Sequence, residues 1–477
     1  MGSVHPSPFS GTWYPGEAGE LRALLDQSFL SSAQRTGRYI RPRGRAFVVP
    51  HAGIVYSGAV ASATYRHVLT AGASRVILLG FAHNGGVDGI AVPDIDGIRT
   101  PLGETNIDHA TTTVLIEQGI ARRVSETLLC DHSVEIQLPF LQSLVPGVKF
   151  VPLFVGRLRT EERLAAARIL AGLATPGTVF LASSDLTHYG SSFHYKPFPV
   201  DSNTRQKLRD VDHGTMEAAS SLDPEMFFDE LSRTGSTVCG TAPISLLLET
   251  LRTLREPELF QETLDYQTSG EITGDFGHSV SYAALGYFPF DAFHLDERDH
   301  EALVESALRT IETLRTTGRR EPVLPEGGSD ALQRRAGVFV SLYHDGELRG
   351  CVGRHVASEP LAEAVPDLTL SAACDDTRFP KTAGESLDVE ISVLTPLKRV
   401  RDANEVRAGQ HGVYLEAGSH RGLLLPQVAS ERNWNRERFL DALAQKAGAR
   451  PDAFQDPATR LSIFRAQIFG NARKRPK

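Results

Sequence analysis

Several residues that can bind metals or carry protons stand at the ends of apolar runs. The runs have the composition of buried strands: Ala46–Val49 (AFVV), Arg75–Gly80 (RVILLG) and Thr178–Ala182 (TVFLA). The polar residues that follow them are His51, His83, Asp185 and His188. If the strands lie parallel in one sheet, their carboxyl ends share an edge, where open α/β sheets bind ligands. Because burying imidazoles with a carboxylate is costly unless they pair or hold an ion, we expect a polar or metal site there.

A cysteine later in the chain extends this set of residues. Cys239 precedes Pro243 and an apolar stretch, Ile244–Leu251, that is typical of a buried helix. Pro243 fits the first helical turn, and a thiol close to a helix N-terminus is favoured as the thiolate. One thiolate with two neutral imidazoles suits iron, copper or zinc. The alternative is a cysteine that packs as a small apolar side chain and does not react.

A short helix is predicted after Asp131, which is a suitable N-cap residue. Within this helix His132 and Glu135 stand three positions apart, so their side chains share one face. Such a pair can ligate a metal or relay protons, and it can equally form a hydrogen bond at the surface. The spacing alone leaves both interpretations open.

The composition indicates the class of protein. A chain of 477 residues is too long for one core, which predicts two or three domains. A formal net charge of −8 provides no basic surface for nucleic acid. No apolar run is long enough to span a membrane, and no secretory signal is visible. Four widely spaced cysteines without a CxxC pair argue against disulfides, so we expect a cytoplasmic protein.

Alternating strand and helix patterns continue to about Tyr287 and describe one α/β domain. Its motifs resemble those of the Memo family in number and order over nearly all of residues 6–288. They are PHAG (50–53), LGFAH (79–83), DHSVE (131–135), SSDLTHYG (183–190), Cys239-Gly240 and SVSY (279–282). The resemblance implies a fold like that of the class III extradiol dioxygenases, which are non-haem iron enzymes.

The resemblance also implies a metal pocket. Its ligands would be His51, His83 and Cys239, surrounded by the acid–base groups Asp185, His188 and His132. Iron or copper is the expected metal, with zinc as the alternative. The dioxygenases hold Fe(II) with two histidines and one carboxylate. Because Cys239 takes the third position here, the resemblance argues for redox chemistry or metal binding alone rather than for ring cleavage.

The second half of the chain has a different pattern. Ala336–His344 alternates like a strand, Asp345-Gly346 predicts a hairpin turn, and Glu347–Val352 is the partner strand. The stretch Leu348–Gly353 (LRGCVG), with later stretches up to Trp434, resembles the AMMECR family over about residues 294–472. The resemblance implies an α+β domain and no settled activity. The predicted organisation is a Memo-like domain at 1–289, a linker at 290–298 and an AMMECR domain at 299–477.

Three residues of the predicted AMMECR domain could line a pocket: Arg349, Cys351 and Asp375. An arginine beside a cysteine suits an anionic ligand or a reactive thiol. The alternative is a packed cysteine in a strand bounded by glycines.

These patterns support three hypotheses about function. The first is a metal-binding redox protein that acts on a small molecule or a peptide. The second is a metal-free enzyme with Cys239 as nucleophile, His51 or His188 as base, and Asp185 orienting the base. The third is a scaffold that binds a partner without catalysis. In prokaryotes the two families tend to be encoded together with a radical-SAM protein, which makes such a protein a candidate partner.

Overall fold

The computed structural model describes residues 3–125, 131–254, 257–356, 359–379, 386–456 and 458–472. The chain forms two compact units, unit 1 (Met1–Ala292) and unit 2 (Phe293–Lys477). The division falls within residues 290–298, where the sequence predicts a linker. These residues form a 3-10 helix, η3 (Phe290–Phe293), and the start of helix α11 (Glu297–Thr317).

Unit 1 is built on a nine-stranded sheet with the order β10-β12-β2-β9-β3-β8-β4-β7, and β11 pairs with β12. Four neighbouring strands are parallel: β2 (Ala46–Val49), β9 (Thr178–Ser183), β3 (Arg75–Gly80) and β8 (Lys149–Val155). The other strands are β4 (Ile90–Pro93), β7 (Arg122–Val124), β10 (His188–Gly190), β11 (Leu259–Thr268) and β12 (His278–Pro289). The predicted parallel arrangement is therefore confirmed for the three strands that end at the candidate residues.

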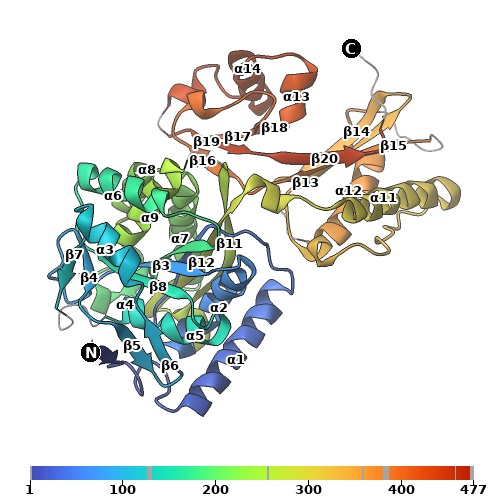
Figure 1. Cartoon of the computed structure of the whole chain (residues 1–477). Coiled ribbons are helices and arrows are strands. Elements are labelled where there is room, and N and C mark those ends of the chain that lie inside the picture. The colour runs from blue at the N-terminus through green and yellow to red at the C-terminus, as the bar shows by residue number, and fades with distance from the viewer. Residues whose placement is uncertain are drawn as a thin grey trace. The chain divides into compact units, whose positions relative to one another are not determined.

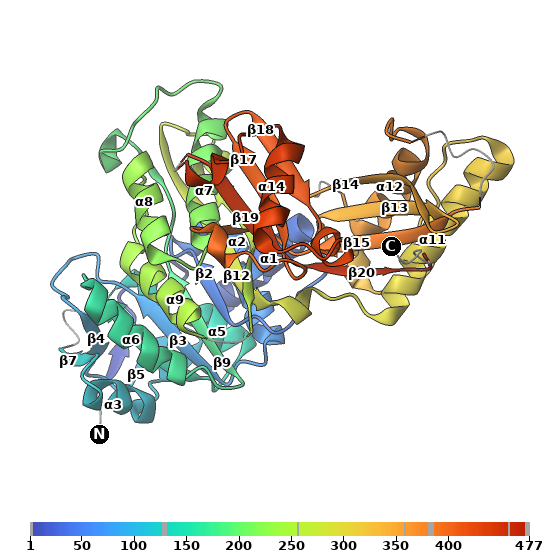
Figure 2. The same cartoon turned by 90° about the horizontal axis from the view of Figure 1, so that it is seen from above.

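Helices cover both faces of this sheet (Figures 1 and 2). One face packs against α6 (Thr160–Gly172), α7 (Thr204–Ser220), α8 (Pro224–Thr234) and α9 (Thr241–Thr253). The other is covered by α1 (Ala18–Thr36), α2 (Ile54–Thr70) and α5 (Leu138–Leu144). The remaining helices of unit 1 are α3 (His109–Glu117), α4 (His132–Glu135) and α10 (Ser269–Thr273). A small second sheet joins β1 (Val4–Pro6), β5 (Gly97–Thr100) and β6 (Gly103–Asn106).

The sequence of the central strands explains their burial. Every residue of β2 and β9 is buried, which is typical of a parallel strand with helices on both faces. The core on the α6–α9 side includes Val48, Ile77 and Phe180 from the strands, packed with Leu247 and Leu251 of α9. This rigid sheet fixes the positions of the loops that follow its carboxyl ends.

Unit 2 contains two four-stranded sheets. The first has the order β14-β13-β15-β20, formed by β14 (Glu347–Arg354), β13 (Val338–His344), β15 (Asp388–Leu394) and β20 (Ala466–Gly470). The second has the order β16-β19-β17-β18, formed by β16 (Lys398–Val400), β19 (Arg460–Phe464), β17 (Gly412–Ala417) and β18 (His420–Leu424). The predicted hairpin is confirmed, because β13 and β14 are antiparallel and Asp345 and Gly346 both have positive φ.

The helices of unit 2 divide between its two sheets. The first sheet packs against α11 and α12 (Leu361–Cys374), and Figure 1 shows both helices lying beside it. The second sheet packs against α13 (Pro426–Glu431) and α14 (Arg436–Ala447). Unit 2 is thus an α+β domain. Among the described residues of the whole chain, no helix combines the length and apolar character needed to cross a membrane.

A close contact at Gly240 fixes the start of α9 against the end of β9. A Cβ atom at this position would lie 2.4 Å from Cβ of Ser184 and 2.6 Å from the carbonyl oxygen of Ser183. The backbone oxygen cannot move aside without disturbing β9. Only glycine therefore allows the loop that carries Cys239 to approach the strand this closely.

We expect Gly240→Ala to lower the free energy of unfolding of unit 1 by roughly 1–3 kcal/mol, the usual cost of overpacking. Urea unfolding can be followed by tryptophan fluorescence in a Trp434→Phe background, in which Trp13 reports on unit 1. The control is Gly19→Ala in α1, where nothing lies within 4 Å of the added Cβ and where alanine favours the helix. Equal stability of the two variants would show that the close contact does not constrain the loop.

Candidate metal centre

Three side chains from separate segments meet at the carboxyl edge of the sheet. His51 follows β2, His83 follows β3, and Cys239 lies just before α9. Strand β9 runs between β2 and β3, so its own carboxyl end lies between the two histidines. This order places the two imidazoles on either side of the segment that begins at Ser183.

The three ligand atoms offered by His51, His83 and Cys239 all lie within 4.8 Å of one another. The Cys239 Sγ atom is 3.2 Å from His51 Nε2. Metal bonds of about 2.0 Å to nitrogen and 2.3 Å to sulfur place two tetrahedral ligand atoms roughly 3.5 Å apart. His51 is only 1% exposed, whereas the side chain of His83 is 31% exposed. The cluster therefore has the dimensions of a metal site, with access from the side of His83.

A chain of hydrogen bonds holds the His51 ring. Its Nδ1 lies 3.0 Å from Ser183 Oγ, which accepts a hydrogen bond from Gln137 Nε2, while Gln137 Oε1 accepts one from Tyr65. When Nδ1–H donates to Ser183, the Nε2 lone pair faces Cys239. Burial, with the charges that His132 and His83 would carry, lowers the pKa of His51 well below its usual value. The imidazole is thus neutral, as a metal ligand must be.

Asp131 holds the ring of His83. Its Oδ1 lies 2.9 Å from His83 Nδ1, and its Oδ2 accepts the backbone N–H of His83 at 2.7 Å. The same carboxylate caps α4 by accepting the N–H of Ser133. Burial acts to raise the pKa of Asp131, but the hydrogen bond and charge of His83 outweigh it and bring the pKa to about 2. By accepting the Nδ1 proton of His83, the ionised carboxylate leaves Nε2 of this ring available as a ligand atom.

Cys239 lies against the segment that follows β9. Its Sγ accepts the backbone N–H of Asp185 at 3.2 Å and lies 3.8 Å from Ser184 Oγ. Burial and the negative charge of Asp185 raise the pKa of the thiol. The expectation that the start of α9 would favour a thiolate is therefore not met in the metal-free site, because desolvation dominates.

Asp185 and His132 border the three ligand residues. Asp185 is 4% exposed and accepts the backbone N–H of His51 at 2.9 Å, and burial raises its pKa to about 7. The His132 ring stacks at 4.0 Å on both Trp13 and His83 and lies 5.3 Å from the His51 ring. Burial and the charge of His83 lower the pKa of His132 to about 4.

His188 lies on β10, and its Nδ1 is within 3.1 Å of the carbonyl oxygens of Leu186 and Thr237. Burial lowers the pKa of His188, and its charge contributes to the lowered pKa of His51.

Glu135, by contrast, does not face the cluster. It accepts hydrogen bonds from Tyr14 and from Ser7, and it does not share a site with His132.

Asp131 belongs to the candidate site through its hydrogen bonds to His83, whereas the sequence predicts it only as a helix N-cap. Its position directly before His132 was the available signal. The residues 126–130, which include Cys130, lie outside the described part of the chain.

The three residues of unit 2 that the sequence predicts to line one pocket each have different partners in the structure. Arg349 pairs with Glu347 at 3.2 Å, and Asp375 pairs with Arg320. Cys351 is contacted instead by the loop that follows α12. Its backbone N–H donates to Asp376 at 2.9 Å, and its carbonyl oxygen accepts from Arg378 at 2.7 Å.

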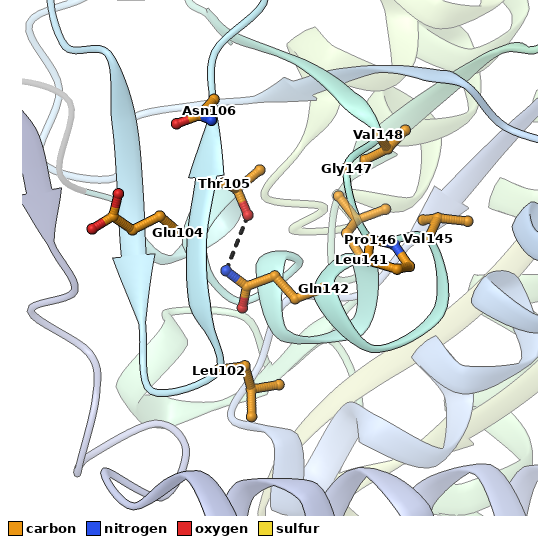
Figure 3. Close-up of a pocket in the computed structure, with 10 residues that line it drawn as sticks. All are labelled: Leu102, Glu104, Thr105, Asn106, Leu141, Gln142, Val145, Pro146, Gly147 and Val148. Atoms are coloured by element: carbon orange, nitrogen blue, oxygen red, sulfur yellow. Dashed lines mark hydrogen bonds between the residues drawn. The ribbon is translucent and has the colours of Figure 1, made fainter.

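A pocket of about 200 Å³ in unit 1 is lined by residues other than those of the His51, His83 and Cys239 cluster (Figure 3). It lies between β6 and the turn after α5, where Gln142 donates to Thr105 at 3.0 Å. None of the ten residues that line it belongs to the predicted site.

Comparisons with known proteins cover both units. Residues 6–286 match the family described as Memo-like protein, and residues 304–469 match AMMECR1. Protein MEMO1 of Homo sapiens is 30% identical over 286 residues, which are 58% of this chain and 94% of that protein. A relative in Methanothermobacter thermautotrophicus, named only "Protein", is 41% identical over 184 residues, which are 37% of this chain and 95% of that protein.

The solved structure of an uncharacterized protein from Pyrococcus horikoshii is 35% identical and covers 38% of this chain and 97% of its own, with a TM-score of 0.36. The Memo-like match spans more than half of the chain and contains all the residues of the cluster. The chain therefore belongs to the Memo-like family, and its second unit carries an AMMECR1 domain.

Proposed function

We propose that unit 1 binds a redox-active transition metal, iron or copper, through His51, His83 and Cys239. The observation that carries the proposal is the convergence of three ligand atoms within 4.8 Å from three segments far apart in the sequence. A chance grouping of three side chains would not explain why each imidazole is also held by its own hydrogen-bond partner. Ser183 holds His51, and Asp131 holds His83.

The donor set favours these metals. A thiolate with two imidazoles is softer than the two-histidine, one-carboxylate set of the non-haem oxygenases and suits copper or iron, with zinc as the alternative. Three protein ligands leave a coordination position for a small molecule, which can approach from the exposed side of His83. The bound metal would supply electron transfer or polarise that molecule. The fold likeness to extradiol dioxygenases stays a prediction, and the thiolate argues against ring cleavage.

The surrounding residues of the chain would move protons. Asp185, with a pKa of about 7, can accept or release a proton near neutral pH and lies beside both His51 and Cys239. His132 and His188 are neutral at that pH because burial lowers both pKa values. We propose these three as the acid–base groups around the metal.

A metal-free cysteine enzyme is less well supported. Its nucleophile would be the Cys239 thiolate, yet burial and Asp185 raise the pKa of this thiol. The scaffold hypothesis, a radical-SAM partner, a small-molecule or peptide substrate and a cytoplasmic location remain proposals from the sequence.

Metal content provides the direct test. Protein purified from cells supplied with iron, copper and zinc should contain about one equivalent of iron or copper per chain. His51→Ala, His83→Ala and Cys239→Ser should each reduce that content at least roughly tenfold, because each removes one of three ligands. Elemental analysis by mass spectrometry measures it.

The matched control is Cys374→Ser, which removes a partly buried thiol from unit 2 and should leave the metal content unchanged. Circular dichroism would establish that all variants fold. Metal content that survives the three unit 1 substitutions, or that falls with Cys374→Ser, would contradict the proposal.

Metal binding should release about one proton from Cys239. The thiol is protonated in the metal-free protein because its pKa is raised, and it must ionise to bind the metal. At about pH 8.5 Asp185 is already ionised, since its pKa is about 7, so it adds no proton. Calorimetric titration with Zn²⁺ in buffers of different ionisation enthalpy counts the protons released.

Asp185→Asn should release the same single proton at this pH, whereas Cys239→Ser should release none while binding the ion more weakly. A wild-type titration without proton release would show that the sulfur does not enter the coordination sphere as a thiolate.

A further inference from the structure

A fully buried amide group lies on the Nδ1 side of the His51 ring. Gln137 stands directly before α5, and none of its surface is exposed. Its Nε2 lies 2.9 Å from the carbonyl oxygen of Pro50 and 3.1 Å from Oγ of Ser183. Its Oε1 lies 2.8 Å from the hydroxyl oxygen of Tyr65. Because Ser183 and Tyr65 are also fully buried, the hydrogen bonds of this amide are made inside the core of unit 1.

The orientation of the Gln137 amide is fixed by Pro50. A carbonyl oxygen can only accept a hydrogen bond, so the NH2 group must face Pro50 and the amide oxygen must face Tyr65. The second hydrogen of the NH2 group then points at Ser183 Oγ, which accepts it. Turning the amide over would bring two oxygen atoms together without a hydrogen between them. Gln137 therefore donates to Ser183 and does not accept from it.

This donation determines where the Ser183 hydroxyl places its own hydrogen. A hydroxyl group has one hydrogen to donate, and within the described part of the chain its acceptor is Nδ1 of His51, at 3.0 Å. Burial keeps the His51 ring neutral, so a ring that accepts at Nδ1 carries its proton on Nε2. That proton points at Cys239 Sγ, 3.2 Å away, and the thiol can donate in turn to the carbonyl oxygen of Asp185 at 3.5 Å. Every donor in this chain of hydrogen bonds then has an acceptor.

We propose that Gln137 is a positioning residue that holds metal-free His51 in the tautomer with its proton on Nε2. The other tautomer would require Ser183 Oγ to accept from both Gln137 and His51. The Ser183 hydroxyl hydrogen would then have no acceptor among the residues that the structure describes. A buried donor without a partner is costly, so the chain of hydrogen bonds selects one tautomer.

The consequence for metal binding rests on the proposed function. A ligand nitrogen needs a free lone pair, so His51 can bind a metal through Nε2 only after the proton has left that nitrogen. One proton leaves Nε2 and one is taken up at Nδ1, so the ring stays neutral and keeps the same number of protons. Because this exchange deprives the Ser183 hydroxyl of its acceptor, the hydrogen bond from Gln137 weakens metal binding. Gln137 thus tunes the affinity of the site without touching the metal.

Gln137→Glu reverses the selection with almost no change of shape. The glutamate has at most one hydrogen where the amide has two, and Pro50 accepts it, so an oxygen lone pair faces Ser183. Ser183 can then donate to the glutamate and accept Nδ1–H of His51, which leaves Nε2 free. We expect this variant to carry the ring proton on Nδ1 and to bind Zn²⁺ roughly tenfold more tightly than the wild type. Substitution of a residue that only stabilised the fold would not strengthen metal binding.

Nitrogen NMR of the full chain with ¹⁵N-labelled histidine tests the tautomer in the absence of metal. The chemical shifts of the two ring nitrogens show which one carries the proton, and His51→Ala identifies the signals of His51. We expect the proton on Nε2 in the wild type and on Nδ1 in Gln137→Glu. The matched control is Gln261→Glu, which changes another buried amide of unit 1, one that donates to the carbonyl oxygen of Met216 at 3.0 Å. This control should leave the His51 signals and the Zn²⁺ affinity unchanged.

A proton on Nδ1 in the wild type would overturn the inference, and this measurement decides the matter even if Gln137→Glu does not fold. The inference also fails if Gln137→Glu keeps the wild-type tautomer, or if it binds Zn²⁺ no more tightly than the wild type does. A wild type that shows the expected tautomer and binds no Zn²⁺ would instead reject the proposed metal site. The assignment of the His51 tautomer to Gln137 would then stand.

Discussion

The parallel pairing of β2, β9 and β3 is the constraint on which the candidate site depends. Three strands in this order bring His51, the segment after Ser183, and His83 to one edge of the sheet. The loop before α9 then adds Cys239, and it can do so because Gly240 has no side chain to collide with β9. The cluster is therefore a product of sheet topology, which places the two histidines, and of one close backbone contact, which places the loop that carries Cys239.

The electrostatics of the site follow from burial. Two causes of pKa change dominate in this site. Desolvation keeps His51, His132 and the Cys239 thiol uncharged, while a hydrogen bond from His83 keeps Asp131 ionised. A cation placed among the three ligand atoms would stabilise the thiolate and relieve the cost of its desolvation. The two hydrogen-bond partners of the imidazoles already orient the ring nitrogens for that ion.

Much of this arrangement could be predicted from the sequence, because strand ends in a parallel sheet must meet at one edge. The positions of His51 and His83 are predicted in that way, Cys239 is predicted from its place before an apolar helix, and the resemblance to the Memo family implies that the three bind one metal. What the sequence could not provide was the direction of individual side chains. Glu135 follows His132 by three residues yet bonds to the N-terminal segment. In unit 2, Asp376 accepts the backbone N–H of Cys351, whereas the neighbouring Asp375 pairs with Arg320. The path of the loop after α12 determines which of the two carboxylates reaches Cys351.

The central claim is that one sulfur and two imidazole nitrogens bind the same ion. X-ray absorption at the metal edge of the loaded protein tests this claim most directly, because it identifies the element and its ligand atoms together. The account predicts iron or copper with one sulfur at roughly 2.3 Å and two nitrogens at roughly 2.0 Å. A first shell made only of nitrogen and oxygen, or a spectrum unchanged by Cys239→Ser, would contradict it.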